Sequence, residues 1–189
     1  MKRLSILIRS LESRQQKLDH LLRSLYVQLL ALPPEQTPLV EILTDIDNKE
    51  VTSGEKANRL LERATGEYVC FIDDDDHVYD NYIKLILQAT ESRPDCVATQ
   101  GHYSQNGGAK QLWMLSKDFH DHDSNGILYR RANHLTPVKR QYALAAKFPH
   151  ISNAEDKAYS QRLNQYLKTE TTITEPIYHY DYETFNKQY

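Results

Sequence analysis

The sequence predicts an α/β protein built on a doubly wound, mostly parallel sheet. Short apolar runs alternate with amphipathic helical segments over the first half of the chain, which is the pattern of a parallel sheet covered by helices. Acidic residues follow two of these runs, and ligands of such sheets bind outside the carboxyl ends of the strands. The 189 residues, 40% hydrophobic and 26% charged, suffice for one domain with a buried core.

The first half alternates regularly. Residues 4–8 (LSILI) are strand formers, and leucines recur at helical spacing over 17–32 until Pro33 breaks that helix. Ser53 and Gly66 are the expected N-cap and C-terminal stop of the second helix. The later elements expected in this half are strands over 39–47, 67–72 and 95–101, and a helix over 79–92. Right-handed crossovers between these strands give a Rossmann-like sheet.

The second half is less regular. The patterns predict strands over 111–116, 127–131 and 169–182, and helices over 136–148, begun by Pro137, and over 153–167. No internal repeat, low-complexity linker or domain boundary is visible, so we expect one domain over residues 1–189.

Charge and cysteine content exclude several classes of protein. The net charge is -3 with both signs interspersed, which gives no reason to expect nucleic acid or a membrane surface as partner. Cys70 and Cys96 match neither a disulfide framework nor a thiolate metal site, and a reducing cytoplasm fits them. No run reaches about 18 apolar residues, and the N-terminus has no cleavage-site pattern. We expect a soluble cytoplasmic protein.

Four consecutive aspartates, 73–76, follow the strand of residues 67–72 directly. Like charges this close repel, so the run should be exposed or neutralised by a cation. Mg²⁺ and Mn²⁺ prefer oxygen ligands, whereas the calcium-loop spacing fails because His77 or Val78 stands where an acid or amide is needed. The alternative is a solvated acidic turn at the start of the helix near Tyr79.

The stretch GEKANRLLERATGEYVCFIDDDDHVYDNYI, residues 54–83, resembles the nucleotide-sugar-binding half of family 2 glycosyltransferases with the A-type fold. The resemblance implies the nucleotide-diphospho-sugar transferase (GT-A) fold, with residues 1–100 binding the nucleotide sugar and residues 101–189 binding the acceptor. It also implies a UDP-sugar as the commonest donor, Mn²⁺ or Mg²⁺ as cofactor, a glycan or other hydroxyl acceptor, and hexosyl or deoxyhexosyl transfer with inversion.

The resemblance also assigns roles to single residues. Metal ligands are expected at Asp75, at Asp73 of the D-x-D element and at His179 near the C-terminus. Asp156 is the expected general base, with Glu155 beside it. The residues expected to bind the donor are Ser10, Asp45, Lys56, Asn58, Asp73, Asp74 and His134, the last of which could also face the acceptor.

Several alternatives stay open. Asn153 with Asp156, and Ser152 with Glu155, have capping spacing, so the two acids could simply begin a helix. The loop with His120 and His122 is expected to be solvated, or to form a flap over the acceptor. A nucleotidyltransferase should carry a glycine-rich loop after the first strand, which is absent. A noncatalytic sugar-nucleotide or metal-binding module is the other alternative.

Overall fold

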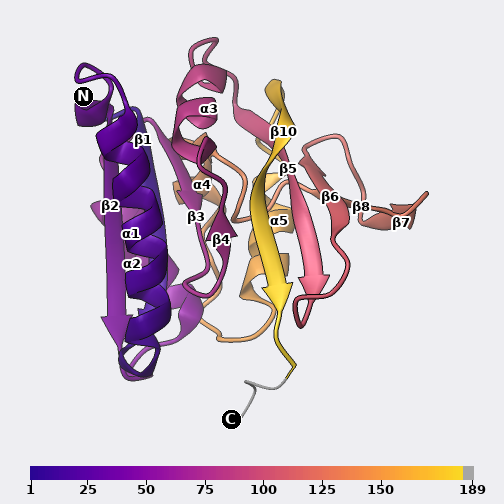
Figure 1. Ribbon diagram of the computed structural model, residues 1–189, viewed down its shortest axis with the longest axis horizontal. Coiled ribbons are helices and arrows are strands. Elements are labelled where there is room, and N and C mark those ends of the chain that lie inside the picture. The colour runs from indigo at the N-terminus through magenta and orange to yellow at the C-terminus, as the bar shows by residue number, and fades with distance from the viewer. Residues whose placement is uncertain (185–189) are drawn as a thin grey trace.

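A ten-stranded sheet lies between two layers of helices in the computed structural model, which describes residues 1–184 (Figure 1). The strands are β1 (Leu4–Leu11), β2 (Val40–Asp47), β3 (Tyr68–Phe71), β4 (His77–Val78), β5 (Cys96–Gln105), β6 (Gln111–Ser116), β7 (His122–Ser124), β8 (Ile127–Arg131), β9 (Val138–Lys139) and β10 (Glu170–Tyr182). The helices are α1 (Gln15–Ala31), α2 (Ser53–Arg63), α3 (Tyr82–Ala89), α4 (Arg140–Ala146) and α5 (Glu155–Leu163), with short 3₁₀ turns η1 (Glu12–Arg14) and η2 (Thr37–Leu39).

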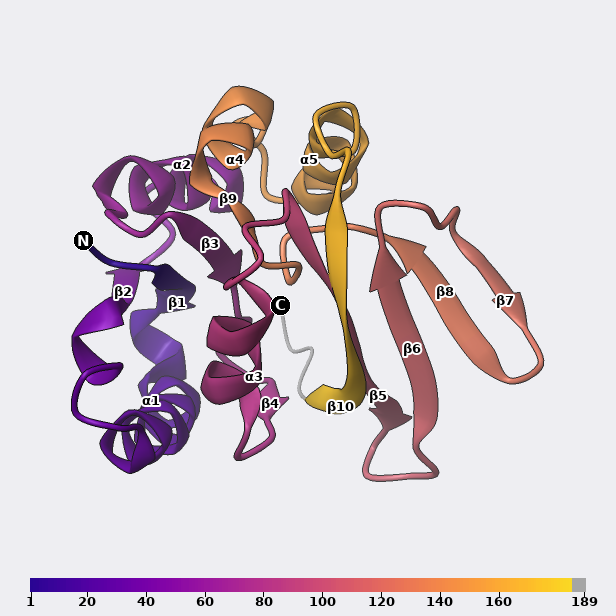
Figure 2. The same ribbon diagram turned by 90° about the horizontal axis from the view of Figure 1, so that it is seen from above.

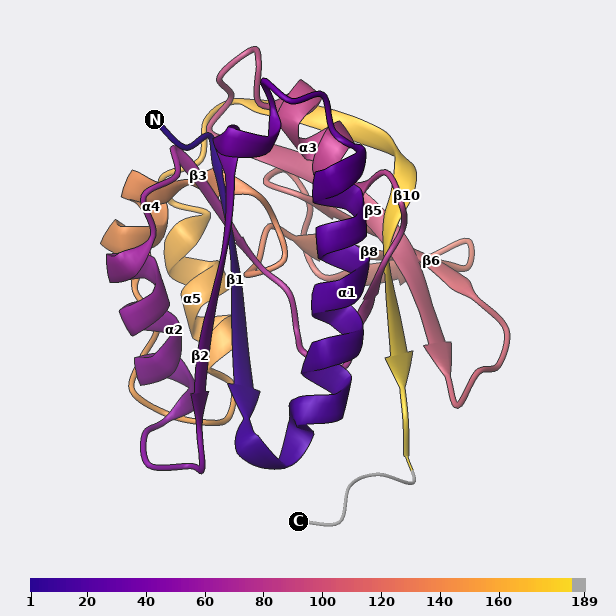
Figure 3. The same cartoon turned by 60° about the vertical axis from the view of Figure 1, so that its left-hand side comes forward.

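The predicted fold class is confirmed. β1 pairs in parallel with both β2 and β3, and the short antiparallel β9 joins β3 to β5. The order β2-β1-β3-β9-β5-β6-β8-β7 places the first strand inside the sheet, as double winding requires. Figure 3 shows β1, β2 and β10 ending at one edge of the sheet, so loops that follow them gather there.

Each face of the sheet has its own helices and core. Alternate residues of β1 divide between them, with Ile6 and Ile8 facing α1 and α3 and Leu7 facing α2, α4 and α5. Figure 2 shows α1 and α3 on one face and the other three helices on the opposite face. Of the leucines at helical spacing in α1, Leu18, Leu21 and Leu25 are buried, and Leu22 and Leu29 pack partly buried against the same core, so this periodicity was interpreted correctly.

β10 returns from the end of the chain into the middle of the sheet. It runs parallel to β5, with an irregular register around Pro176, and pairs in antiparallel fashion with β4 through Tyr178 and His179. This placement brings the last strand beside the segment that follows the aspartate run.

The structure corrects the predicted limits of α2 and α3. Thr52, not Ser53, caps α2, because its side-chain oxygen accepts from the Glu55 backbone N–H. The helix ends at Arg63, before Gly66. α3 begins at Tyr82 rather than at residue 79, because His77 and Val78 form the short strand β4.

The helices of the second half are also shorter than predicted. Pro137 leads into strand β9 rather than a helix, and α4 begins only at Arg140. α5 begins at Glu155 after Ala154, which has φ +62°, and no side chain caps it. The capping interpretation of Asn153 and Ser152 was therefore wrong. No helix within residues 1–184 combines the length and apolar character that a membrane crossing requires.

Candidate active site

A cavity of about 1030 Å³ opens at the carboxyl ends of β1 and β3. Its polar lining comes from β1, the loop before α2, the aspartate run, the loop after β8 and the start of α5. The charged and histidine side chains that line it are Arg9, Arg14, Lys49, Glu50, Lys56, Asp73, Asp74, Asp75, Asp76, His134, Glu155 and Asp156. The edge of the sheet predicted to bind a ligand is therefore hollow.

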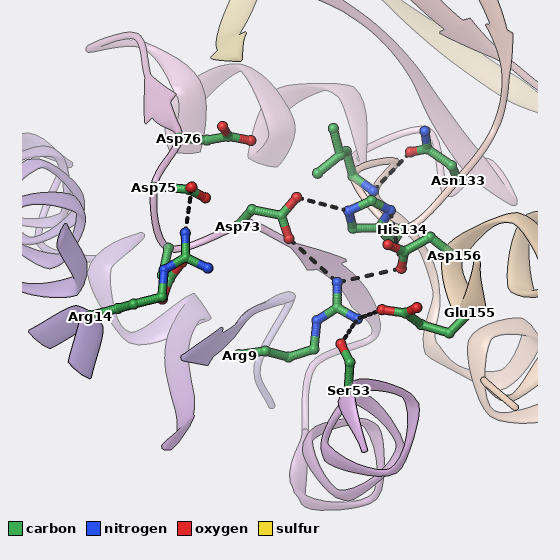
Figure 4. Close-up of polar contacts among 12 residues, drawn as sticks. Arg9, Arg14, Ser53, Asp73, Asp75, Asp76, Asn133, His134, Glu155 and Asp156 are labelled. Carbon is green, nitrogen blue, oxygen red and sulfur yellow. Dashed lines mark hydrogen bonds and ion pairs between the residues drawn. The ribbon is translucent and has the colours of Figure 1, made fainter. Parts of the chain in front are cut away.

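Arg9 lies two residues before the end of β1 and is the central cation of this site (Figure 4). Its guanidinium lies 3.4 Å from a carboxylate oxygen of Asp73, 3.4 Å from Asp156 and 3.3 Å from Glu155. The guanidinium also packs over the Phe71 ring, 5.5 Å from its centroid. Burial alone would lower the pKa of Arg9, but the three carboxylates outweigh burial and raise it, so Arg9 stays charged.

Asp73 and Asp156 face each other across His134 as well. The His134 ring lies with Nε2 3.3 Å from Asp73 Oδ2 and Nδ1 3.5 Å from Asp156 Oδ1, the second without hydrogen-bond geometry. Burial lowers the pKa of His134, but Asp156 and Asp73 outweigh it and raise the pKa. Burial raises the pKa of Asp73, yet His134 and Arg9 hold it well below its usual range. The carboxylate of Asp73 is thus ionised and held by Arg9 and His134.

Asp74 and Asp75 share a cation from the segment after β1. Arg14 lies 3.0 Å from Asp74 Oδ1 and also contacts the Asp75 carboxylate closely. The Ser10 hydroxyl donates a 2.5 Å hydrogen bond to Asp74, which is buried, and Lys17 Nζ lies 3.8 Å from Asp75. Asp75 remains the more exposed of the two, with 37% of its side-chain surface open.

Asp76 points away from these cations into the protein. Tyr178 of β10 donates a 2.5 Å hydrogen bond to Asp76 Oδ2, and its hydroxyl also accepts from the Asp73 backbone N–H at 3.3 Å. Burial and the neighbouring carboxylates, Asp73 foremost, raise the pKa of Asp76. Asp76 Oδ1 is buried without a hydrogen-bond partner.

Most residues predicted to bind the donor do line the cavity, but two do not. Ser10, Lys56, Asp73, Asp74 and His134 line it. Asn58 is buried outside it, with its amide donating to the Phe148 carbonyl and accepting from the Phe148 N–H, both at 2.9 Å. Asp45 lies in β2 and is not part of the lining.

Asp47, at the end of β2, is not part of the lining either, but it contacts a residue that is. Its carboxylate contacts the ammonium of Lys56, which also donates to the Ser10 carbonyl at 2.7 Å. The resemblance pointed instead to Asp45, two residues earlier in the same strand.

His179 lies on the opposite side of β10 from the aspartates. Neighbouring strand residues point to opposite faces, and Tyr178 is the one that faces Asp76. The His179 ring instead makes a 2.8 Å hydrogen bond with Ser104 and packs 6.1 Å from the His77 ring. Tyr180, two residues beyond Tyr178, lines the cavity in its place. His120 and His122 are exposed, as expected for that loop, although His122 begins the short strand β7.

Three residues of this site were missed by sequence reasoning. Arg9 had one usable signal, because a charge interrupts an apolar strand next to Ser10. Arg14 and Tyr178 had none, since a basic residue after a strand and a tyrosine in a strand are ordinary features of a sequence. Only the fold brings them to the aspartates.

The residues present are chemically suited to Mg²⁺ or Mn²⁺. Carboxylate oxygens are hard ligands, Mg²⁺ uses only one or two of them in many proteins, and Asp76 Oδ1 is an unpartnered buried oxygen at the run. Within residues 1–184 no group of three or more His, Cys, Asp or Glu side chains already converges as a ready-made cage.

Comparison with known families decides the classification. The model of the family described as "Glycosyl transferase family 2" matches residues 43–154, more than half of the chain, including the aspartate run. The chain belongs to glycosyl transferase family 2. The predicted resemblance is confirmed, and membership supports a glycosyl transfer role. No curated protein matches the chain.

Solved structures share the fold at low identity. A crystal structure of S. aureus TarS residues 1–349 in complex with UDP has a TM-score of 0.69 at 14% identity, covering 95% of this chain and 60% of that one. The same TarS segment in complex with UDP-GlcNAc gives a TM-score of 0.65 at 13% identity, with 95% and 58% covered. The mannosyltransferase PcManGT from Pyrobaculum calidifontis, in complex with GDP-Man and Mn²⁺, gives 0.56 at 14%, with 94% and 56% covered. This member of family 2 thus has the GT-A fold and spans about three fifths of the TarS 1–349 segment.

Proposed function

We propose that this family 2 glycosyltransferase transfers a hexosyl or deoxyhexosyl group from a nucleoside-diphosphate sugar, with UDP as the favoured nucleotide, to a hydroxyl acceptor with inversion. One observation carries the proposal: the aspartate run and Asp156 line the same cavity and are joined there through Arg9 and His134. The UDP, UDP-GlcNAc and GDP-Man complexes of the similar structures support a nucleotide-sugar donor.

The diphosphate of the donor is assigned to the aspartate end of the cavity. Asp75, with Asp73, would hold Mg²⁺ or Mn²⁺. The Mn²⁺ in the PcManGT complex supports a divalent cation here. When bound, the cation would stabilise the negative charge that grows on the diphosphate as the glycosidic bond breaks. The placement of His179 beside Ser104 and His77 argues against it as a further ligand.

Asp156 is proposed as the general base. As the acceptor oxygen forms its bond to the anomeric carbon, the bond to the diphosphate oxygen breaks and the acceptor proton passes to the Asp156 carboxylate. Arg9 holds Asp156 and Glu155 side by side, and Glu155 is buried, which favours a positioning role for Glu155. His134, between Asp73 and Asp156, lies where donor sugar and acceptor would meet.

A second cavity of about 490 Å³ is proposed as the entry of the acceptor. It shares Asn133, His134 and Asp156 with the first cavity and continues to Arg131 and Lys157. The division into a donor half over 1–100 and an acceptor half over 101–189 fits this arrangement, with His134 and Asp156 at the border. A cytoplasmic location is proposed as well, because both cysteines are buried free thiols, as suits a reducing compartment.

The test separates binding from transfer. Calorimetric titration of UDP and GDP, with Mn²⁺ and with chelator, should give metal-dependent binding of one nucleotide that Asp75→Asn abolishes. Asp156→Asn should keep this binding and lose donor turnover by about 100-fold or more, the ordinary contribution of a general base. Asp80→Asn, an exposed acid outside the cavity, serves as the control. Full turnover in Asp156→Asn would refute the base assignment, and binding without any turnover by the wild type would favour the noncatalytic module.

A further inference from the structure

Each of the four aspartates of the run has at least one polar partner within the chain. Asp73 has Arg9 and His134, and Asp76 accepts from Tyr178. Asp74 and Asp75 have a cation between them as well, the guanidinium of Arg14. A divalent cation bound at Asp75 would meet a carboxylate that already has a close positive partner.

Arg14 and Arg9 differ in how firmly they are held. Arg9 is enclosed by three carboxylates and the Phe71 and Phe148 rings, and only 10% of its side-chain surface is open. Arg14 ends the 3₁₀ turn before α1, is 36% open on its side chain, and lines the large cavity near Ser10 and Lys56. A long side chain at this rim can change partner without disturbing the core.

We propose that Arg14 is an exchangeable counter-ion, which holds Asp74 and Asp75 when no ligand is bound and moves to the donor diphosphate when a divalent cation binds Asp75. This inference rests on the proposed function. The planar guanidinium suits both partners, because it binds carboxylate and phosphate oxygens in the same forked geometry. The exchange leaves Asp75 and the Arg14 guanidinium each with a partner of opposite charge, before and after the donor binds.

The exchange couples the two ligands of the site. The cation alone must displace Arg14 from Asp75, and the nucleotide alone must draw Arg14 away from both carboxylates. Each ligand removes the obstacle to the other, so each should raise the other's affinity by the same factor. Arg14 is thereby assigned as a positioning residue that makes metal and donor bind together.

Lys17 provides a matched control. It carries the same charge, comes from the first turn of α1, and its side chain is also 36% open. Its Nζ is 3.8 Å from Asp75 but 3.2 Å from Glu183, and Lys17 does not line the cavity. Removing Lys17 tests the general effect of a nearby positive charge.

The experiment compares Arg14→Met and Lys17→Met with the wild type in three titrations: Mn²⁺ alone, UDP in chelator, and UDP with saturating Mn²⁺. In Arg14→Met, Mn²⁺ alone should bind about five- to tenfold more tightly, the equivalent of losing two partly exposed ion pairs. UDP in chelator should bind several-fold more weakly, and the coupling factor between Mn²⁺ and UDP should fall. Lys17→Met should change each constant by less than about twofold.

Two results would overturn the exchange. One is an unchanged Mn²⁺ affinity in Arg14→Met. The other is an equal change of the binding constants in Arg14→Met and Lys17→Met, which would indicate only the general electrostatic effect of a nearby positive charge. If the wild type binds UDP under neither condition, the donor-site proposal fails first, and the exchange with it. Circular dichroism melting checks the fold, and Arg14→Lys, which keeps the charge without the fork, should give intermediate constants if Arg14→Met does not fold.

Discussion

The hydrogen-bond partners of a single side chain can show whether that side chain binds a ligand or supports the fold. Asn58 was expected to bind the donor, yet both ends of its amide are bonded to the Phe148 backbone. Its partners therefore indicate a structural role, joining α2 to the segment after α4.

Asn58→Ala should lower the free energy of unfolding by about 2 to 3 kcal/mol, because it leaves a buried N–H and a buried carbonyl of Phe148 without partners. UDP affinity in Mn²⁺ should change little. Urea unfolding and calorimetry measure the two quantities, and Asn48→Ala, at an exposed position, is the control. A variant of unchanged stability that bound UDP tenfold more weakly would restore the donor assignment.

The charged residues of the site were only partly predictable. Asp73 to Asp76 could be predicted as site residues because they are adjacent in sequence and follow a buried strand. The residues that neutralise them are distant: 64 positions separate Arg9 from Asp73, and 147 separate it from Asp156. No local pattern encodes such pairs, so the sequence predicted the acids and not their pairing with Arg9.

At the scale of elements, local periodicity predicted the parallel strands and the helices that cover them. Local periodicity did not predict the short strands that form only by pairing with distant segments. The two residues of β9 carry no strand pattern of their own and become a strand only because they fit between β3 and β5. β4 forms likewise against β10.

Gly101 shows how closely β5, β6 and β10 pack. A Cβ at this position would lie 2.4 Å from the Trp113 ring and 2.4 Å from the Tyr178 carbonyl oxygen. Gly101→Ala should therefore cost about 1 to 3 kcal/mol of stability by overpacking, and should weaken metal-dependent UDP binding by shifting Tyr178. Thermal unfolding checks the first effect and calorimetry the second.

The double variant Gly101→Ala/Trp113→Leu provides the control, since a smaller residue at position 113 makes room for the added methyl. Its loss of stability should be less than the sum of the two single losses. Simple additivity would mean that the Trp113 ring is not what the methyl group meets.

For the whole molecule, the acid side of the stability curve should depend on Asp95, which precedes β5. Its carboxylate accepts from Lys139 Nζ, from Tyr142 and from the backbone N–H groups of Lys168 and Thr169, all within 3.2 Å. Burial would raise the pKa of Asp95, but the Lys139 ammonium and the two backbone groups outweigh it and lower the pKa to about 2. The ionised form thus stabilises the fold.

A depressed carboxyl pKa contributes stability above its unfolded value, near pH 4, that is lost as pH falls toward 2. Asp95→Asn should therefore lose on the order of 2 kcal/mol at pH 7 and show a flatter decline in stability between pH 4 and pH 2. Urea unfolding at several pH values measures both curves. Parallel curves for the variant and the wild type would show that Asp95 does not carry this acid dependence.

The pairing of Tyr178 with Asp76 has a consequence for how the protein is made. The aspartate run leaves the ribosome 102 residues before the tyrosine that binds it, and β5 likewise precedes β10, its parallel neighbour. Until β10 arrives, a growing chain exposes one open edge of β5 and a cluster of carboxylates that lacks its tyrosine. Chains released at successive lengths should therefore bind nucleotide only when they extend past residue 178. Nucleotide binding would then show that β10 has been synthesised.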